Sequence, residues 1–570
     1  MTRLLPVLSV ALAFGCVAPL AMAASGEPVS SGALPTSVAD LRARVKHVFV
    51  IYQENRSFDS YFGTFPGVEN LAGPLARGHG FLQHDAIGNQ TIAPYRIADP
   101  DVADVDHSRP ALYAKVDGGT MGKFVEDEEL RKLKAGVSPN DAQRLGLLTM
   151  AHQDCDTVPF LWKYANAFAL YDHIFQGMYG PSTPGNIDLV SAQTGLTQAA
   201  RHPEQTVEKS DTGAGVPVVD DLDPAFGPYH TGKPRTNPIQ DDLTFANLLL
   251  TLSGSSATDA TIDNGDIKDD ISALARTGAK PVPWGWYQEG FNDDGSGTYP
   301  AYVTHHDVPQ FFGYIRQNPK LWANVHDLTE LLPTIAKGTL GERSVTFVKG
   351  GYHNPFGWKP ANPDPAVQKA FLGDDDHPGY SDSQLSESLV ATVVNAVARS
   401  PYWNDSAIVV VWDDSEGFYD HVPPPQFEQC PDGRSCGDGP RVPLILISPF
   451  AKSHAIVSDP GDHASFAKFL NVLFDLTPLS SLPDEKPYLP QGPRDGNPAL
   501  TDLLGGFDAA RLSGTAAPIP ASYAIVPDDV VSTFPAAMSC QSLGITPVTV
   551  PGGLAAPPPG FAPRLSPPTP

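Results

Sequence analysis

Four stretches of the chain are apolar and rich in β-branched residues throughout, without the alternation typical of a half-exposed strand. They lie at 47–52, 344–349, 407–412 and 442–447. A strand of this kind is buried on both faces, as in a parallel sheet that is covered by helices. Apolar residues at helical spacing occupy 383–399 and 465–474. The alternation of the two patterns predicts an α/β fold, in which helices sandwich a central, mostly parallel sheet.

The chain has 570 residues, of which 41% are hydrophobic, enough for one large or two moderate domains. Its first residues have the order of a secretory signal, with Arg3, an apolar run and then Ala21-Met22-Ala23. We therefore expect a signal peptide at 1–23 and a secreted or periplasmic protein, with a lipoprotein site at Cys16 as the alternative. The rest of the sequence has no apolar stretch that is long enough to span a bilayer, so stable membrane insertion is not expected.

The remaining chain divides by composition. Between about 201 and 280 it is rich in Asp, Gly, Ser, Thr and Pro around one apolar segment, which we interpret as an insertion in a domain at 24–546. Residues 547–570 are rich in Pro, Ala and Gly and poor in charge. This composition favours extended polyproline conformation and predicts a disordered tail.

Removal of the signal leaves four cysteines, Cys155, Cys430, Cys436 and Cys540, in an oxidising compartment. Cys430 and Cys436 flank a Pro-Asp-Gly turn, which favours a local bridge. Cys155 is then left with Cys540 by elimination alone. Four cysteines allow three connectivities, and free thiols stay an alternative.

The formal net charge is −26, so the surface repels polyanions at neutral pH. Nucleic acid is therefore not expected as a partner, and a solvated acidic surface is the simplest interpretation. A substrate that carries phosphate needs local positive charge, which a metal ion supplies. Nothing in the sequence indicates the oligomeric state.

Polar residues follow two of the predicted buried strands directly. Glu54 and Asn55 come after the first strand, and Asp413 and Asp414 come after the third. Ligands of open parallel sheets bind beyond the carboxyl ends of the strands, so neighbouring strands would bring these side chains together. Crowded carboxylates repel one another unless a cation lies among them, and oxygen donors suit a divalent ion. The alternative is that these residues only cap a helix and occupy a turn.

A third polar loop, at 178–186, places Ser182 and Thr183 between Gly and Pro, ahead of a helical segment. Backbone N–H groups at the N-terminus of a helix favour anions, so a hydroxyl in this place suits a nucleophile that attacks a phosphate. The alternative is a plain helix cap.

Together these segments resemble the phosphoesterase family of bacterial acid phosphatases and phospholipases C, a branch of the alkaline phosphatase superfamily. The run at 54–63, Glu-Asn-Arg-Ser-Phe-Asp-Ser-Tyr-Phe-Gly, is similar to the opening signature of that family. The likeness continues in the same order at 106–107, 117–119, 180–182, 284–287, 305–306, 376–380, 413–414, 417–424 and 462–465. It implies an alkaline-phosphatase-like sheet with insertions.

The resemblance also implies a set of site residues. The metal ligands of the family fall on Glu54, Asn55, Asp413 and Asp414, and its nucleophile falls on Ser182, which also touches the metal. The histidines around the phosphate fall on His107, His305, His306 and His377. One divalent ion is implied: all-oxygen ligation favours Ca²⁺, Mg²⁺ or Mn²⁺, whereas the wider superfamily commonly uses Zn²⁺.

The adjacent histidines and the residues after the acidic pair depart from a simple reading of this assignment. Adjacent side chains of an extended backbone point in opposite directions, so His305 or His306 is expected to be the weaker contact unless a turn lies there. Where relatives often have two glycines after the acidic pair, this chain has Glu416-Gly417.

The implied activity is that of a secreted, metal-dependent hydrolase of phosphoric esters that forms a phosphoserine at Ser182. The phosphatases of the family carry serine at this position and the phospholipases C usually carry threonine, so an acid phosphatase is the main prediction. A phospholipase C that cleaves phosphodiester lipids is the first alternative, with phospholipid as its substrate. A non-catalytic secreted surface protein is the second, and the complete set of acids argues against it.

Overall fold

The computed structural model describes residues 37–206, 218, 220–221, 242–254, 265–292, 301–429, 435–533 and 538–565. All of these residues belong to one unit, Thr36–Pro570. The predicted signal at 1–23 lies outside them, as does much of the predicted insertion at 201–280.

An eight-stranded sheet with the order β15-β6-β14-β11-β1-β10-β8-β9 forms the centre of this unit. Its strands are β1 (His47–Gln53), β6 (Ala169–Tyr171), β8 (Trp284–Gln288), β9 (Val325–Asp327), β10 (Ser344–Lys349), β11 (Ser406–Trp412), β14 (Leu444–Ile447) and β15 (Ala455–Val457). All neighbours are parallel except at β14, which runs antiparallel to β11 and to β6. The predicted α/β fold with a mostly parallel sheet is confirmed, and each of the four predicted stretches contains a strand.

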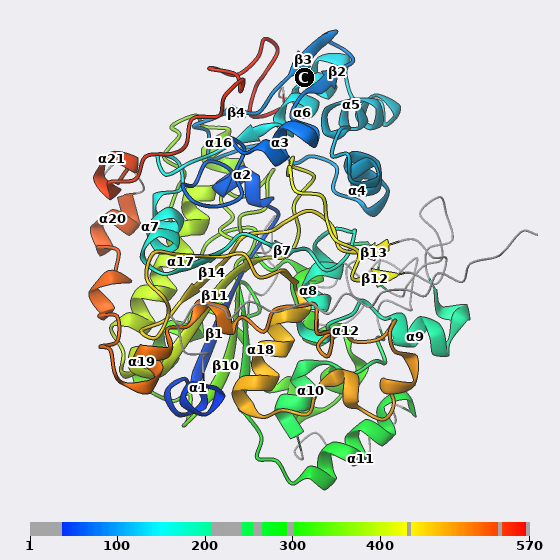
Figure 1. The fold of residues 1–570 in the computed structure, drawn as a ribbon, viewed down its shortest axis with the longest axis vertical. Helices are drawn as coiled ribbons and strands as arrows, with labels where there is room; N and C mark the ends of the chain where they lie inside the picture. Colours follow the sequence, from blue (N-terminus) through cyan, green and yellow to red (C-terminus); the bar gives the residue numbers. More distant parts are fainter. Residues whose placement is uncertain are drawn as a thin grey trace, which may run out of the picture. The chain divides into compact units, whose positions relative to one another are not determined.

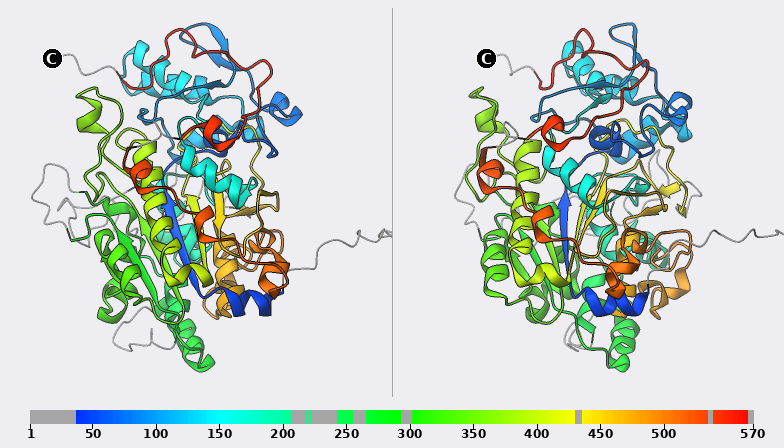
Figure 2. Two further views of the ribbon diagram at one scale, coloured as in Figure 1. Left: turned by 90° about the vertical axis from the view of Figure 1, so that its left-hand side faces the viewer. Right: turned by 60° about the vertical axis from the view of Figure 1, so that its left-hand side comes forward.

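Helices cover both faces of this sheet, which explains why β1, β10 and β11 are buried along their whole length. One face carries α7 (Pro159–Ala167), α15 (Leu331–Lys337), α17 (Ser383–Ala398) and α20 (Asp528–Thr533) (Figures 1 and 2). The other carries α1 (Val38–Arg44), α8 (Ser182–Ser191), α10 (Leu248–Ser253), α12 (Val308–Phe311) and α18 (Ala464–Phe474) (Figure 1). The helices predicted at 383–399 and 465–474 are α17 and α18.

Apart from the elements of a smaller layer described below, the other helices and strands lie in the segments that connect these elements. The helices are α2 (Phe58–Phe62), α9 (Leu196–Arg201), α11 (Lys268–Thr277), α13 (Gly313–Arg316), α14 (Pro319–Trp322), α16 (Val367–Ala370), α19 (Ala509–Ser513) and α21 (Cys540–Leu543). The strands are β7 (Ile174–Phe175), β12 (Glu428–Gln429), β13 (Ser435–Gly437) and β16 (Gly461–Asp462). Among the described residues, no helix combines the length and apolarity that crossing a membrane requires.

A smaller layer, which we call the cap, lies at the carboxyl end of the central strands (Figure 1). It comprises α3 (Pro74–Gly78), β2 (Gln83–Asp85), β3 (Gln90–Ile92), β4 (Tyr95–Arg96), α4 (Arg109–Val116), α5 (Phe124–Lys134), α6 (Pro139–Leu148) and β5 (Ala151–His152). The cap has its own hydrophobic core, which includes Ile92, Leu112 and Phe124.

The C-terminal segment 547–565 packs on this cap, in contrast to the disordered tail predicted from its composition (Figure 1). Leu554 forms a β-bridge with Tyr95, and Phe561 packs edge-on against the same tyrosine ring with centroids 5.4 Å apart. The few apolar side chains between the prolines supply these contacts, so a count of prolines and glycines underestimates the order of the segment.

A disulfide joins Cys155 to Cys540, the pairing that elimination predicted. It links the segment ahead of α7 to the start of α21. Cys436 is also disulfide-bonded, and Cys430, its predicted partner, lies outside the described residues.

Candidate active site

The central position of β1 brings the two acidic loops together. β1 lies between β10 and β11, and its last residue, Gln53, is paired with Trp412 of β11. Glu54 and Asn55 therefore leave the sheet beside Asp413, whose Oδ1 accepts a hydrogen bond from the Asn55 backbone N–H at 3.2 Å. Glu54, Asn55, Asp413 and Asp414 are all buried, and they form one cluster as the sequence predicts.

The Ser182 hydroxyl faces this cluster from the first residue of α8. Its Oγ lies 3.1 Å from Asn55 Oδ1 and 3.3 Å from Asp414 Oδ2. The hydroxyl of Thr183 instead donates to the carbonyl oxygen of His305 at 3.3 Å. Of the two hydroxyls in the predicted loop, only that of Ser182 makes hydrogen bonds to the acidic cluster.

Two residues in the first turns of α8 fix its position against the loop after β11. The Asn186 side-chain amide donates to the Ser182 carbonyl oxygen at 2.7 Å and to Asp413 Oδ2 at 2.9 Å. A Cβ atom on Gly185 would lie only 2.2 Å from the Asp413 carbonyl oxygen, so this close approach requires glycine. Sequence analysis identified neither residue as part of the site.

A buried lysine, also missed from the sequence, lies within the acidic cluster. Lys349 is the last residue of β10, and its ammonium group forms an ion pair with Glu54 and lies 3.5 Å from Asp413 Oδ2. Burial lowers the pKa of Lys349, although the nearby carboxylates oppose this shift. Its place at the end of a predicted buried strand was the available signal, the same one that identified the acids.

His305 and His306 lie in a 3₁₀ turn, Thr304–His306, which is the condition under which both can face the site. Their ring centroids are 4.3 Å apart. His306 is fully buried with Nε2 3.3 Å from Glu54 Oε2, and His305 is half-buried. Burial, together with His305 and His377, holds the pKa of His306 well below its ordinary value.

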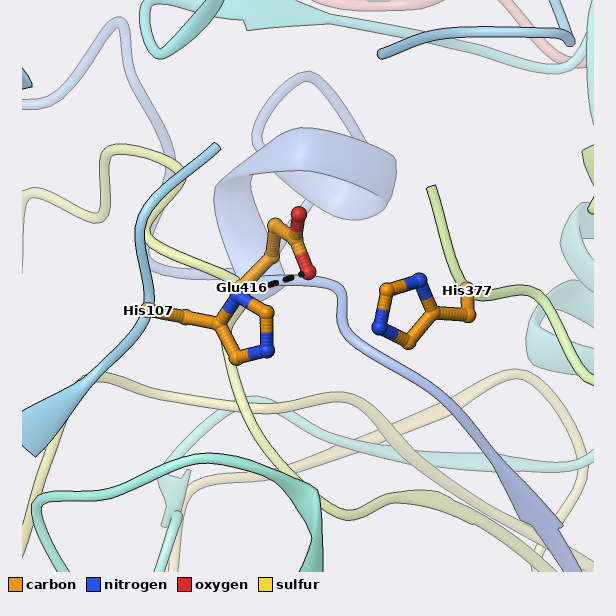
Figure 3. A group of neighbouring side chains, drawn as sticks. All are labelled: His107, His377 and Glu416. Atoms are coloured by element: carbon orange, nitrogen blue, oxygen red, sulfur yellow. Dashed lines mark ion pairs between the residues drawn. The ribbon is translucent and has the colours of Figure 1, made fainter. Parts of the chain in front are cut away.

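His107 and His377 approach the cluster from the cap side, with ring centroids 5.6 Å apart (Figure 3). The carboxylate of Glu416, which the sequence showed only as a departure from the glycines of relatives, lies between them and accepts a hydrogen bond from Asn55 Nδ2 at 2.8 Å (Figure 3). Burial acts to lower the pKa of His107, but Glu416 and Asp414 outweigh it and raise this pKa well above its ordinary value.

The acidic cluster suits a divalent cation by its donors and by its charge. Its donors are the oxygens of carboxylates and an amide, which hard cations such as Ca²⁺, Mg²⁺ and Mn²⁺ prefer. Glu54 Oε2 is buried and has no hydrogen-bond partner among the described residues. Burial and the adjacent Asp413 raise the pKa of Asp414 to about 8, which reflects repulsion that a cation relieves. Lys349 supplies only one positive charge to three carboxylates.

Comparison with known proteins places the chain in a family. The Phosphoesterase family matches residues 45–477. A non-hemolytic phospholipase C of Burkholderia pseudomallei is 22% identical over 85% of this chain and 62% of its own length. Non-specific phospholipase C6 of Arabidopsis thaliana is 23% identical over 76% of this chain and 68% of its own length, and phospholipase C B of Mycobacterium tuberculosis is 23% identical over 75% and 73%. The chain thus spans about three fifths of the length of the Burkholderia relative.

Solved structures show a weaker likeness. A protein in the alkaline phosphatase superfamily from Vibrio parahaemolyticus has a TM-score of 0.30 and 9% identity, over 78% of this chain and 69% of that chain. The PsFucS1 sulfatase from Pseudoalteromonas has a TM-score of 0.32 and 9% identity, over 78% and 72%. The family match covers the strands, loops and helices that carry the acidic cluster, Ser182 and the four histidines, and the chain belongs to the Phosphoesterase family.

Proposed function

We propose that this chain is a metal-dependent phosphoric-ester hydrolase of the phospholipase C type, with Ser182 as its nucleophile. The observation that carries the proposal is the Ser182 hydroxyl, which lies within 3.3 Å of both Asn55 and Asp414 at the carboxyl edge of the sheet. The fold does not require a hydroxyl among buried acids, whereas a nucleophile must lie beside the groups that activate it.

The comparisons support a phosphodiester substrate rather than the monoester of the predicted acid phosphatase. The named relatives from two bacteria and a plant are phospholipases C. The serine at position 182, which favoured a phosphatase, is one residue of one loop, whereas these relatives align over 75% or more of the chain. We therefore expect cleavage on the glycerol side of a phosphodiester lipid.

The acidic cluster prepares the attacking group. A divalent ion held by Glu54, Asn55, Asp413 and Asp414 would supply positive charge that lowers the pKa of a nearby hydroxyl and offsets the charge of the phosphate. Asp414 Oδ2, 3.3 Å from Ser182 Oγ, holds the hydroxyl in place, and Asn186 fixes the turn that carries it.

Ser182 Oγ then attacks phosphorus while its proton passes to Asp414 Oδ2, which accepts its hydrogen bond, and the bond from phosphorus to the glycerol oxygen breaks. The leaving oxygen takes a proton from a histidine of the site, for which His377 has a suitable place because its side chain is only partly buried. Water next attacks phosphorus and gives a proton to the same histidine, the bond to Ser182 Oγ breaks, and the serine recovers its proton from Asp414. His107 and the Asn55 amide lie where they can hold the non-bridging oxygens.

Substrate assays on the chain without 1–23 test the proposed class. We expect diacylglycerol and phosphocholine from phosphatidylcholine, and little inorganic phosphate from a phosphomonoester. Release of phosphate from the monoester alone would restore the acid phosphatase prediction, and no hydrolysis of either substrate with the metal bound would favour a binding protein.

Substitution tests the nucleophile. Ser182→Ala is expected to lower kcat by at least about 10³-fold while the metal content stays unchanged. Ser191→Ala is the matched control, because this serine is buried at the other end of α8 and its Oγ makes no hydrogen bond among the described residues. Normal turnover by Ser182→Ala, or its loss only in Thr183→Ala, would remove Ser182 from this role.

A further inference from the structure

Two buried carboxylates outside the acidic cluster meet at the same edge of the sheet. Glu289 directly follows β8, the neighbour of β10, and its backbone N–H donates to the Lys349 carbonyl oxygen at 3.1 Å. Asp374 approaches it from the loop ahead of His377, and the two carboxyl groups lie within hydrogen-bonding reach of each other. Glu289 is 3% exposed and Asp374 is 0% exposed. Neither side chain takes part in the proposed hydrolysis.

Each of these carboxylates has one oxygen without a hydrogen-bond donor. Asp374 Oδ1 accepts a hydrogen bond from the Gly351 backbone N–H at 3.2 Å, whereas Asp374 Oδ2 has no partner among the described residues. The same holds for Glu289 Oε2. A buried acceptor without a donor is unfavourable, and more so when it is charged, so the two free oxygens call for a positive partner.

No basic side chain supplies that partner. Among the described residues, neither Glu289 nor Asp374 forms an ion pair with lysine, arginine or histidine. The main charges that act on Glu289 are those of Asp374, Asp375 and Asp327, all of them negative. The pair therefore differs from an ordinary buried ion pair, in which the acid and its cation come from the same chain.

A buried acidic group elsewhere in the fold shows the contrast. Asp59 and Asp420 lie close together with His421, and their ligand atoms are within 4.8 Å of one another. Arg441 neutralises them, with Nη2 3.0 Å from Asp59 and Nε 2.9 Å from Asp420. The guanidinium takes the place of a cation there, and no such group is present at Glu289.

Two adjacent glycines let the carboxylates approach the backbone. A Cβ atom on Gly350 would lie 2.5 Å from Asp374 Oδ1. A Cβ atom on Gly351 would overlap the Ala301 carbonyl oxygen and would lie 2.7 Å from Glu289 Oε2. The Ala301 carbonyl and Glu289 thus face the same glycine, whose N–H group holds Asp374. Three oxygen donors from separate segments gather at this point of the fold.

We propose that Glu289 and Asp374 bind a structural cation of the Ca²⁺ class, with the Ala301 carbonyl oxygen as a third ligand. Its two positive charges balance the two carboxylates. Carboxylates bind Ca²⁺ through one oxygen or two, and backbone carbonyls are common ligands in its irregular coordination. Mg²⁺ requires a regular octahedron, and Zn²⁺ favours histidine and cysteine, neither of which belongs to this set.

Such an ion ties two histidine-bearing segments to the sheet. Ala301 lies ahead of the turn Thr304–His306, and Asp374 lies ahead of His377. Glu289 is anchored at the end of β8, so an ion that joins the three holds both segments at the sheet edge without contact to the substrate. This structural role does not rest on the proposed function.

Calcium binding tests the proposal without reliance on turnover. The chain without 1–23 is stripped with a chelator and dialysed to equilibrium against radioactive Ca²⁺. We expect Glu289→Gln and Asp374→Asn each to bind one equivalent fewer than the wild type. Both changes remove a charge and keep the size of the side chain, so the variants should fold, and circular dichroism checks this. Glu342→Gln, at an exposed position, is the control and should bind as the wild type does.

Asp414→Asn separates this site from the acidic cluster, of which Asp414 is a proposed ligand. In that background we expect one equivalent of Ca²⁺ to remain and to raise the unfolding temperature, and both effects to disappear when Glu289→Gln is added. Equal calcium content in the wild type and Glu289→Gln, or no stabilisation of Asp414→Asn by Ca²⁺, would overturn the site and leave a carboxyl pair that shares a proton. The expected calcium binding in a chain that cleaves no phosphoester would refute the proposed function and keep this inference.

Discussion

At the scale of single residues, Lys349 differs most from the site that the sequence predicts, because it is a buried cation among the predicted metal ligands. It places an ammonium group beside Glu54 and Asp413, which the sequence analysis predicted to be ligands of a cation. Lys349→Met leaves these buried carboxylates unpaired, and removal of one partner of a buried ion pair typically costs about 3–5 kcal/mol. We expect a loss of this size in urea unfolding with chelator present, and partial recovery when a divalent ion is added.

The recovery is the informative part of that experiment, because an ion that binds among the acids replaces the missing ammonium charge. The exposed Lys452→Met is the control and should leave unfolding unchanged with and without the ion. A Lys349→Met protein that is destabilised equally with and without added ion would speak against a cation site at these acids.

His47 makes stability depend on pH at a residue far from the chemistry. Burial lowers its pKa to about 4, while its ring lies against Tyr402 and Nδ1 lies 2.9 Å from Ser344 Oγ. The unfolded chain binds the proton more tightly, so this contribution is present above pH 6.5 and is lost as the pH falls toward 4. The shift corresponds to about 3 kcal/mol.

Free energies of unfolding measured between pH 7 and pH 4 test this contribution. His47→Gln should flatten the decline by about that amount, whereas Gln in place of the exposed His454 should not change it. Parallel pH profiles of the wild type and His47→Gln would contradict the assignment.

At the scale of elements, catalysis depends on how closely α8 approaches the loop after β11. Gly185→Ala would place a Cβ 2.2 Å from the Asp413 carbonyl oxygen, so α8 must move and carry Ser182 with it. A displacement near 1 Å lowers turnover by about 10²-fold. Gly78→Ala in α3 meets nothing within 4 Å and should keep normal turnover. If Gly185→Ala is as active as the wild type, the position of Ser182 does not depend on this contact.

The same elements show which parts of the fold and of the site the sequence patterns predict. Buried runs of β-branched residues identified β1, β10 and β11, because their composition follows from burial on both faces. The antiparallel direction of β14 was not predicted, since a buried strand has the same composition in either direction. Strand ends predicted the acidic cluster, but Lys349 and Glu416 were missed. Lys349 ends a predicted buried strand, but its place beside the acids depends on strand order; the place of Glu416 depends on its positive φ, and neither of these follows from residue types.

At the scale of the whole unit, the residues of the site come from two layers, each with a large hydrophobic core of its own. The main core holds β1, β10 and β11, which position the acids, and the cap carries His107 in the segment ahead of α4. The histidine side of the site therefore depends on how firmly the cap is held. The C-terminal segment 547–565 contributes to this through Leu554 and Phe561.

Removal of residues 547–570 tests this dependence. The deletion uncovers the Tyr95 ring that Phe561 packs against, removes the β-bridge of Leu554 with Tyr95, and breaks the 2.6 Å ion pair of Arg564 with buried Asp101. We expect limited proteolysis to cut the cap, within 74–152, faster than any part of the central sheet. Turnover should fall at least about tenfold because His107 loses its fixed place, while Phe561→Ala should have a smaller effect in the same direction. Unchanged cleavage of the cap in the deletion variant would mean that the cap core is sufficient without this segment, and that His107 is held by α4 and Glu416 alone.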